Sequence, residues 1–254
     1  MKAKLIFGLL GAVLAGNAAE VKSTDTTIPL VQDGGGWSTT ITLLNLGAKP
    51  AGFDINFSTP KGDPWTTTVK ISAGLKAAGD VVTGVIPPGG SVTIQTPNSG
   101  DSVTRGYATL FTYAGGPIGG VARISNGASA MTMGLAPNLE LQFSLPFDTR
   151  AGSATSLVLV SRTPYALIDF AVRDSAGARV LSDRYQFQAA DPRTQVVIDL
   201  AAAYPQLSGT SGTIDCHVSF PGAGQYDEQT FAALALQLDA AGAATLVSSM
   251  APGK

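Results

Sequence analysis

Charged side chains are scarce in this sequence, and the scarcity limits what the protein binds. Asp, Glu, Lys and Arg make up 13% of its residues, against roughly 25% in an average soluble domain. The formal net charge is only −2, so neither sign dominates. Proteins that bind nucleic acid usually carry a concentrated basic patch. We therefore expect no nucleic-acid partner.

Cysteine and histidine are each present once, as the neighbours Cys216 and His217. A single cysteine excludes an internal disulfide, so the fold must be stabilised by its hydrophobic cores. One histidine and one cysteine cannot complete a zinc site. The turns around Asp63, Asp101 and Asp174 lack the acidic spacing of a calcium loop. We expect no metal and no cofactor.

Catalytic constellations are also missing. A hydrolase needs a nucleophile, a base and an orienting carboxylate brought together, but neighbours in a strand face opposite sides of the sheet. Cys216 should therefore be a buried apolar side chain, with Ile214 and Val218, while His217 and Asp215 share the other face. No Gly-x-Ser-x-Gly elbow supplies a serine nucleophile. The sequence predicts no catalytic residue, and we expect that the protein is not an enzyme.

Long apolar runs are absent except near the N-terminus. Lys2 and Lys4 precede an apolar stretch over residues 5–14, and small residues follow at 16–19. This pattern predicts a cleaved signal peptide over residues 1–19, because ten apolar residues are too few to span a bilayer. A retained anchor helix is the alternative. We expect no transmembrane segment and an exported protein, extracellular or at the cell surface, with the periplasm as the alternative compartment.

Hydrophobic residues alternate with polar ones along most of the chain after residue 25, which is the periodicity of half-buried β-strands. Such segments lie at 53–57, 92–95, 107–113, 141–145, 168–172 and 214–218, and the β-branched segment Trp65–Val69 is also predicted to be a strand. Turn sequences rich in Pro, Gly, Asn and Asp separate them. Residues 199–207 are predicted to form one short helix or 3₁₀ turn, which Pro205 limits. The fold class is all-β, a sandwich or barrel.

The sequence repeats itself weakly but in order. Residues 36–44 resemble 152–160, residues 53–62 resemble 168–177, and residues 91–94 resemble 195–198. The first two pairs are offset by 116 and 115 residues and the third by 104, which places an insertion in the first copy at 72–84. We therefore predict two tandem β-sandwich modules, at 26–140 and 141–254. Cleavage near 138–144 should release two fragments, unless the modules share an extensive interface.

Three motifs carry a resemblance to known proteins: the Gly-rich opening before Trp37, the segment Pro87–Val92 and the segment Tyr204–Gly209. The chain resembles tandem β-sandwich repeat proteins secreted by environmental bacteria, whose modules are similar to immunoglobulin-like and fibronectin type III domains. The resemblance implies that fold for nearly all of the chain after the signal peptide. Its motifs are turn and core signals, so it implies no site residues.

Trp37 and Trp65 are the candidate binding residues. Each adjoins a predicted turn, where an indole ring can stack on a sugar or anchor a partner. The structural alternative is that both close the core of the first module, because tryptophan is buried on average.

Two functions remain. We expect a non-catalytic structural or adhesive protein that self-associates, as a homo-oligomer or filament, or docks a partner along exposed strand edges. Segments such as 38–40 and 65–68 present Ser and Thr where edge strands usually carry Lys, Pro or inward charges. The alternative is an extracellular module that binds a surface glycan or a protein through aromatics at the loop end.

Overall fold

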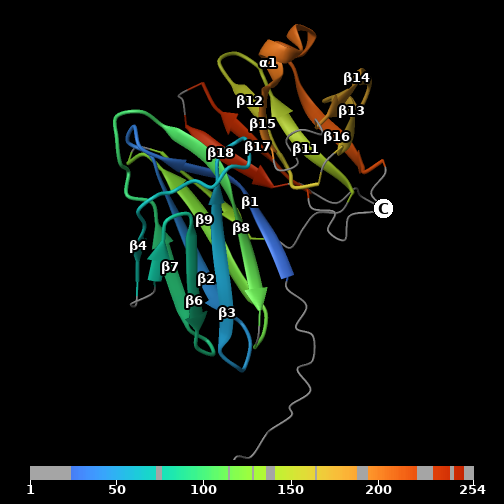
Figure 1. Ribbon diagram of the computed structural model, residues 1–254. Coiled ribbons are helices and arrows are strands. Elements are labelled where there is room, and N and C mark those ends of the chain that lie inside the picture. The colour runs from blue at the N-terminus through green and yellow to red at the C-terminus, as the bar shows by residue number, and fades with distance from the viewer. Residues whose placement is uncertain are drawn as a thin grey trace, which may run out of the picture.

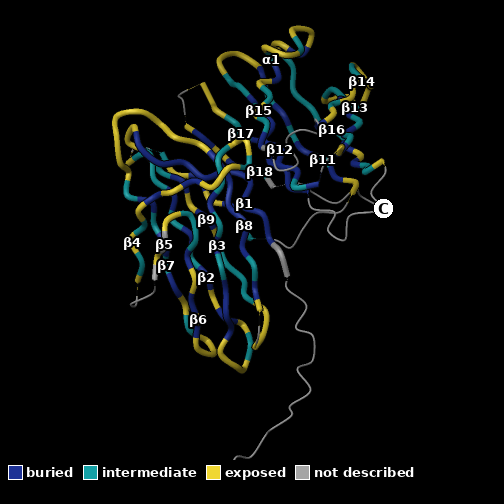
Figure 2. Tube along the Cα trace, viewed as in Figure 1, coloured by how far each residue is buried: buried dark blue, intermediate teal, exposed yellow. Residues whose placement is uncertain are grey.

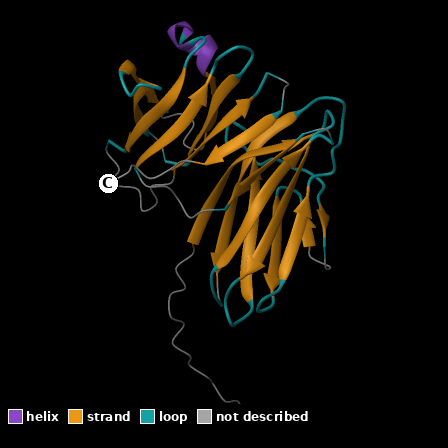
Figure 3. Ribbon diagram, turned by 180° about the vertical axis from the view of Figure 1, so that it is seen from behind, coloured by secondary structure: helices purple, strands orange, loops and turns teal. Residues whose placement is uncertain are grey.

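The computed structural model describes residues 24–72, 76–113, 115–127, 129–135, 141–163, 165–187, 194–221, 231–240 and 243–248. The chain is all-β, as predicted, and its four antiparallel sheets pair into two sandwich-like modules (Figures 1 and 3). The predicted signal peptide lies outside the described residues. No helix in the described ranges is long and apolar enough to cross a membrane.

The first module consists of two five-stranded sheets. One sheet has the order β1-β8-β3-β6-β5, formed by Thr24–Asp33, Thr104–Tyr113, Ala51–Ser58, Val81–Ile86 and Lys76–Ala78. The other has the order β10-β9-β2-β7-β4, formed by Ala130–Gly134, Ile118–Ser125, Ser38–Asn45, Ser91–Gln95 and Lys70–Ile71.

The second module consists of two four-stranded sheets. The outer sheet has the order β11-β16-β13-β14, formed by Gln142–Asp148, Ser211–Ser219, Leu167–Asp174 and Arg179–Gln186. The sheet nearer the first module has the order β15-β12-β17-β18, formed by Thr194–Asp199, Ala154–Ser161, Phe231–Leu238 and Ala244–Ser248.

The two modules have the same topology once β4 and β5 are set aside. Both short strands belong to the first module, and they lie at or beside the predicted insertion at 72–84. Strand register confirms the offsets: Ile41 pairs with Ile94 in the first module, and Leu157 pairs with Ile198 in the second. Offsets of 116 and 104 relate these two pairs. The structure therefore supports an internal duplication.

The pairing follows the immunoglobulin pattern only in part. Counting the eight common strands, the second pairs with the fifth and the third with the sixth, as in immunoglobulin domains. The first strand, however, pairs with the sixth, and the seventh pairs with the second. In immunoglobulin constant domains the first pairs with the second and the seventh with the sixth. Each module is therefore a sandwich in which these two strands have exchanged sheets and the fourth strand pairs with the third instead of the fifth.

Both faces of β12 and β17, the two central strands of the β15-β12-β17-β18 sheet, are largely buried (Figure 2). On one face Leu157 and Leu159 belong to the core of the second module. On the other face Val158 and Leu234 belong to one continuous cluster with the core of the first module. The two modules thus share a hydrophobic interface, and the β15-β12-β17-β18 sheet packs against the first module as an additional layer.

Two of the predicted segments fall differently in the structure. Residues 65–69 form no strand, and the neighbouring β4 begins only at Lys70. Residues 38–40 do form a strand, but β2 is central, between β9 and β7. Neither segment is therefore an open sheet edge. The predicted short helix is present as α1 (Leu200–Ala203), which Asp199 caps, followed by a 3₁₀ turn over Pro205–Leu207.

Candidate functional site

The edges of the sheets decide where another strand can pair, because an edge strand presents unpaired main-chain donors and acceptors. On β1 the backbone is bulged between Ile28 and Val31, and the Pro29 carbonyl accepts a hydrogen bond from Gln195 Nε2 at 2.6 Å. On β11 the equivalent Pro146 has no N–H to donate, and its carbonyl accepts from Gln237 Nε2 at 3.1 Å. Both edges therefore carry a proline and are partly covered.

Several other edges are contacted at a single residue, packed on another strand or occupied by a short strand. The Gln195 N–H at the start of β15 donates to the Pro60 carbonyl of the first module at 2.8 Å. Strands β10 and β18 lie against one another across the module interface. In the first module the edges of β6 and β7 are occupied by the short strands β5 and β4.

Strand β14 contains no proline, although its pairing with β13 is irregular between Arg179 and Leu181. It is eight residues long, most of its side chains are exposed, and it pairs only with β13 (Figure 2). The equivalent strand in the first module is β6, whose outer edge is covered by β5. The second module has no counterpart of β5 among its described strands. Among the residues that the structure describes, the sheet of the second module therefore ends at β14.

Polar side chains cover the outer face of the sheet that β14 completes. Strand register places Gln142, His217, Asp169 and Arg184 in one row across the four strands. Arg184 Nε donates to Asp169 at 2.7 Å. The next row carries Ser144, which donates to Asp215 at 2.7 Å.

Asp215 is the best-connected acid of this face. Partial burial by itself raises its pKa, but hydrogen bonds from Ser144 and Arg173, together with the charges of Arg173 and Arg179, leave the pKa below its ordinary value. Arg173 Nε lies 2.9 Å from the Asp215 carboxylate. Asp215 is therefore held ionised at neutral pH.

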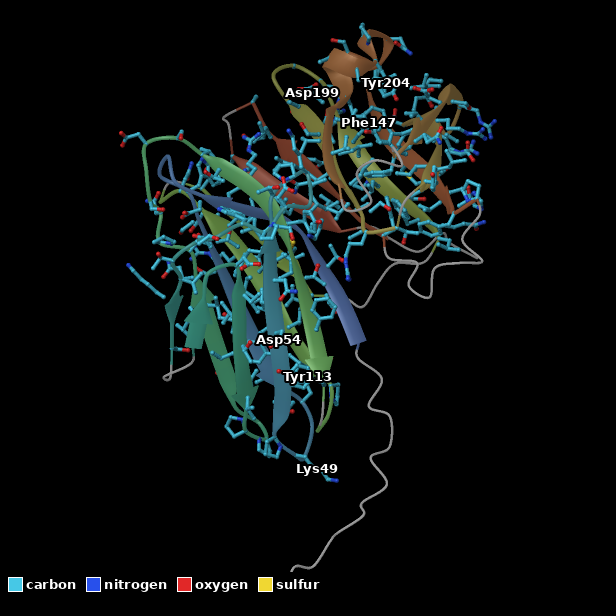
Figure 4. The ribbon with its side chains drawn as sticks, in the orientation of Figure 1. Lys49, Asp54, Tyr113, Phe147, Asp199 and Tyr204 are labelled. Carbon is cyan, nitrogen blue, oxygen red and sulfur yellow. The ribbon has the colours of Figure 1, made fainter. Side chains whose placement is uncertain are left out.

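Besides the Arg184–Asp169 pair, a hydrogen bond from Tyr204 joins β14 to the turn after α1. The Tyr204 hydroxyl donates to Asp183 at 2.7 Å, and Tyr204 lies at this end of the module in Figure 4. Burial, with the hydrogen bond and charge of Asp183, raises the pKa of Tyr204 to about 12. The same hydrogen bond, with one from the Arg184 N–H, lowers the pKa of Asp183. The hydrogen bond from Tyr204 thus holds β14 against the turn that follows α1.

The outer face bears an open hollow of about 600 Å³. The polar residues that line it include Gln142, Asp169, Arg179, Ser182 and His217. Acidic and basic groups alternate on it, so the face suits a polar partner with mixed charge better than a strong anion or cation.

The structure separates Cys216 from His217 as strand alternation predicts. Cys216 is buried in the core of the second module, in register with Phe170, at the position that Leu110 occupies opposite Ile55 in the first module. Burial, and to a lesser extent the charge of Asp215, raises the pKa of its thiol to about 12. His217 is exposed on the other face.

The two tryptophans lie on the core of the first module. Trp65 is 9% exposed and meets Phe57 edge to face, with ring centroids 6.4 Å apart. Trp37 is half-buried and packs on the same cluster. The open edge of β14 and the hollow beside it were not predicted as a site, because they depend on which strands are neighbours across the sheet.

Comparison of the chain with protein-family models, with curated proteins and with solved structures found no match.

Proposed function

We propose that this is a non-catalytic, exported structural or adhesive protein that self-associates by strand pairing at β14. Its resemblance to secreted tandem sandwich proteins with immunoglobulin-like modules supports an extracellular or cell-surface location. The observation that carries the proposal is the contrast between β14, whose edge is open, and the equivalent β6, whose edge β5 covers. A covered edge in one copy and an open one in the other indicates a use for the open edge.

A second copy of the chain is the occupant that we propose. Two identical strand edges are complementary to one another when a two-fold axis relates them, because each main-chain donor then meets an acceptor. Main-chain hydrogen bonds would supply the affinity in such a pair, and alternate side chains would set its register. The charged residues of β14 oppose registers that bring like charges together, which restricts the pairing to a few alignments.

Light scattering of the mature protein tests this proposal. We expect a dimer for the wild-type chain and a monomer for the double variant Val180→Lys, Ser182→Lys, which adds charge along β14. Val180 is 44% exposed and Ser182 is also exposed, so the fold should tolerate both changes. The matched control is Thr66→Lys, Thr68→Lys, which adds the same charge at exposed positions outside any strand.

The control should remain a dimer, and thermal melting should show that both variants are folded. A wild-type protein that is monomeric at high concentration contradicts the proposal. A folded β14 variant that still dimerises also contradicts it.

A further inference from the structure

The outer face of the β1-β8-β3-β6-β5 sheet carries an exposed tyrosine ring held flat against the backbone. Gly52 on β3 lies in register with Tyr113 on β8 and with Val85 on β6. A Cβ atom at Gly52 would lie 2.5 Å from Tyr113 Cε2 and 2.8 Å from Cδ2. The ring therefore rests on the Gly52 backbone, where only glycine leaves room for it. Tyr113 remains 37% exposed.

The hydroxyl of Tyr113 fixes the ring in this position. It donates to Asp54 Oδ1 at 3.1 Å, and the two side chains lie together on the first module in Figure 4. Val85 is 61% exposed, so Tyr113 and Val85 form an apolar strip across three strands. Glycine weakens the interior of a strand, and here it permits an aromatic side chain to lie flat on the sheet.

Polar groups continue from this strip along the same face. Asp54 lies between Phe111 and Thr83 in the next row, and Asn56 lies opposite Thr109 in the row after it. The face ends at the second module, where the Arg162 guanidinium lies 5.1 Å from the Phe111 ring centroid. A pocket of about 90 Å³ at this junction is lined by Asn56, Asp80 and Arg162 among others. Asn56 Oδ1 is buried there without a hydrogen-bond donor.

We propose that this face binds a neutral polysaccharide, with Tyr113 as the platform on which a sugar ring stacks. A pyranose has an apolar face of C–H groups that packs on an aromatic ring, and hydroxyls at its rim that suit carboxylate and amide oxygens. The face offers both kinds of group, with Asp54 beside the ring, whereas Asn56 Oδ1 is buried at the junction of the modules. Two residues of β8 separate Tyr113 from Phe111, where Arg162 of the second module lies. This is about 7 Å of strand, so the exposed stretch has room for a stacked sugar ring of a longer chain.

The charge of the face favours a neutral ligand. Strand register places Asp25 on β1 and Lys76 on β5 in the same row as Asp54, so acidic and basic residues are mixed there, and the cation Arg162 is engaged with Phe111. The internal duplication also provides a comparison. In the second module the equivalents of Tyr113, Gly52 and Val85 are Ser219, Leu167 and Gln186, which lie in the same register. The aromatic platform is therefore specific to the first module, and it is distinct from the β14 edge.

Affinity electrophoresis and calorimetry with soluble hydroxyethylcellulose, xylan and dextrin test the proposal. We expect at least one of these glycans to bind the wild-type protein. Tyr113→Ala should weaken that binding by about tenfold or more, because the ring buries a large apolar area against the sugar. Gly52→Ala should weaken it comparably, since the added methyl group lifts the ring. Tyr113→Phe keeps the ring and should retain most of the affinity.

The matched control is Tyr165→Ala, which removes a tyrosine that is 42% exposed on the second module and should leave binding unchanged. Melting curves identify any variant that fails to fold. If Tyr113→Ala does not fold, Tyr113→Phe still tests the proposal, because it keeps the ring and should retain most of the affinity. Absence of binding to all three glycans overturns the proposal, as does unchanged binding by folded Tyr113→Ala. The β14 lysine variant should bind glycan normally, and Tyr113→Ala should remain dimeric, so this proposal and the proposed function can fail separately.

Discussion

Gln195 of the second module donates a hydrogen bond from Nε2 to the carbonyl oxygen of Pro29 in the first, at 2.6 Å. The same nitrogen also donates to the Gly106 carbonyl at 2.8 Å. The Gln195 side chain is buried, so neither carbonyl can exchange this donor for water without opening the interface. One side chain thus joins two strands of one module to the other.

We expect Gln195→Leu to destabilise the protein by about 2 kcal/mol, because it leaves two carbonyls without a donor at a buried position. Urea unfolding measures the change. Gln237→Leu serves as the comparison, since Gln237 makes a single longer bond to Pro146 at 3.1 Å within one module. A smaller effect at Gln195 than at Gln237 would contradict this account of the interface.

Unfolding of the two modules should coincide, because Val158 and Leu234 of the second module belong to the core cluster of the first. Both tryptophans lie in the first module, and the only cysteine lies in the second. Tryptophan fluorescence and thiol exposure therefore report on the modules separately. We expect the two signals to have the same midpoint. Leu234→Ala should lower the free energy of unfolding obtained from each signal by about 3 kcal/mol. Two separated midpoints would show instead that the modules unfold independently.

Gly106→Ala and Gly212→Ala should each destabilise the protein by more than about 3 kcal/mol. The two glycines occupy equivalent positions, and a Cβ atom at either would overlap a backbone carbonyl, that of Ser58 or of Arg173. Neither carbonyl can move without displacing its strand. Gly134→Ala on β10 is the control, since no atom lies within 4 Å of its added Cβ, and calorimetric melting compares the three variants.

Cys216 should react with a thiol reagent only after denaturation. Its folded pKa of about 12 exceeds the ordinary 9.0, so the folded state disfavours the thiolate. The stability that the neutral thiol contributes is complete below pH 9 and declines as the pH rises toward 12. We also expect Cys216→Ala to cost about 1 kcal/mol in lost packing. Rapid labelling of the native protein at pH 8 would contradict the buried position.

The alternation of side chains was sufficient to predict the strands around residues 53–57, 168–172 and 214–218, and the opposite faces of Cys216 and His217. It was sufficient because each of these strands has a buried face, which fixes the period of two. The repeat offsets likewise placed the insertion, since they depend on sequence order alone. The short helix or 3₁₀ turn at 199–207 was predicted with Pro205 as its limit, and the structure adds Asp199 as the cap of α1.

Predictions that depend on a pairing partner could not be made from the sequence. Residues 65–69 have strand propensity, but propensity does not provide a neighbouring strand, and in the structure none pairs with them among the described residues. The Tyr113 platform depends on the register between residues 52 and 113. That register joins segments distant along the chain, and no local pattern specifies it.

Strand β5 has a consequence for how many copies can join. A molecule with one open edge can bind one other molecule, so strand pairing at β14 ends with a pair. A molecule with two open edges has a valence of two and grows into a polymer. Because β5 ends its own sheet and is only three residues long, it presents a shorter edge than the six-residue β6 that it covers. If β14 joins two copies, a chain without β5 would carry a second long edge, and pairs would extend into polymers.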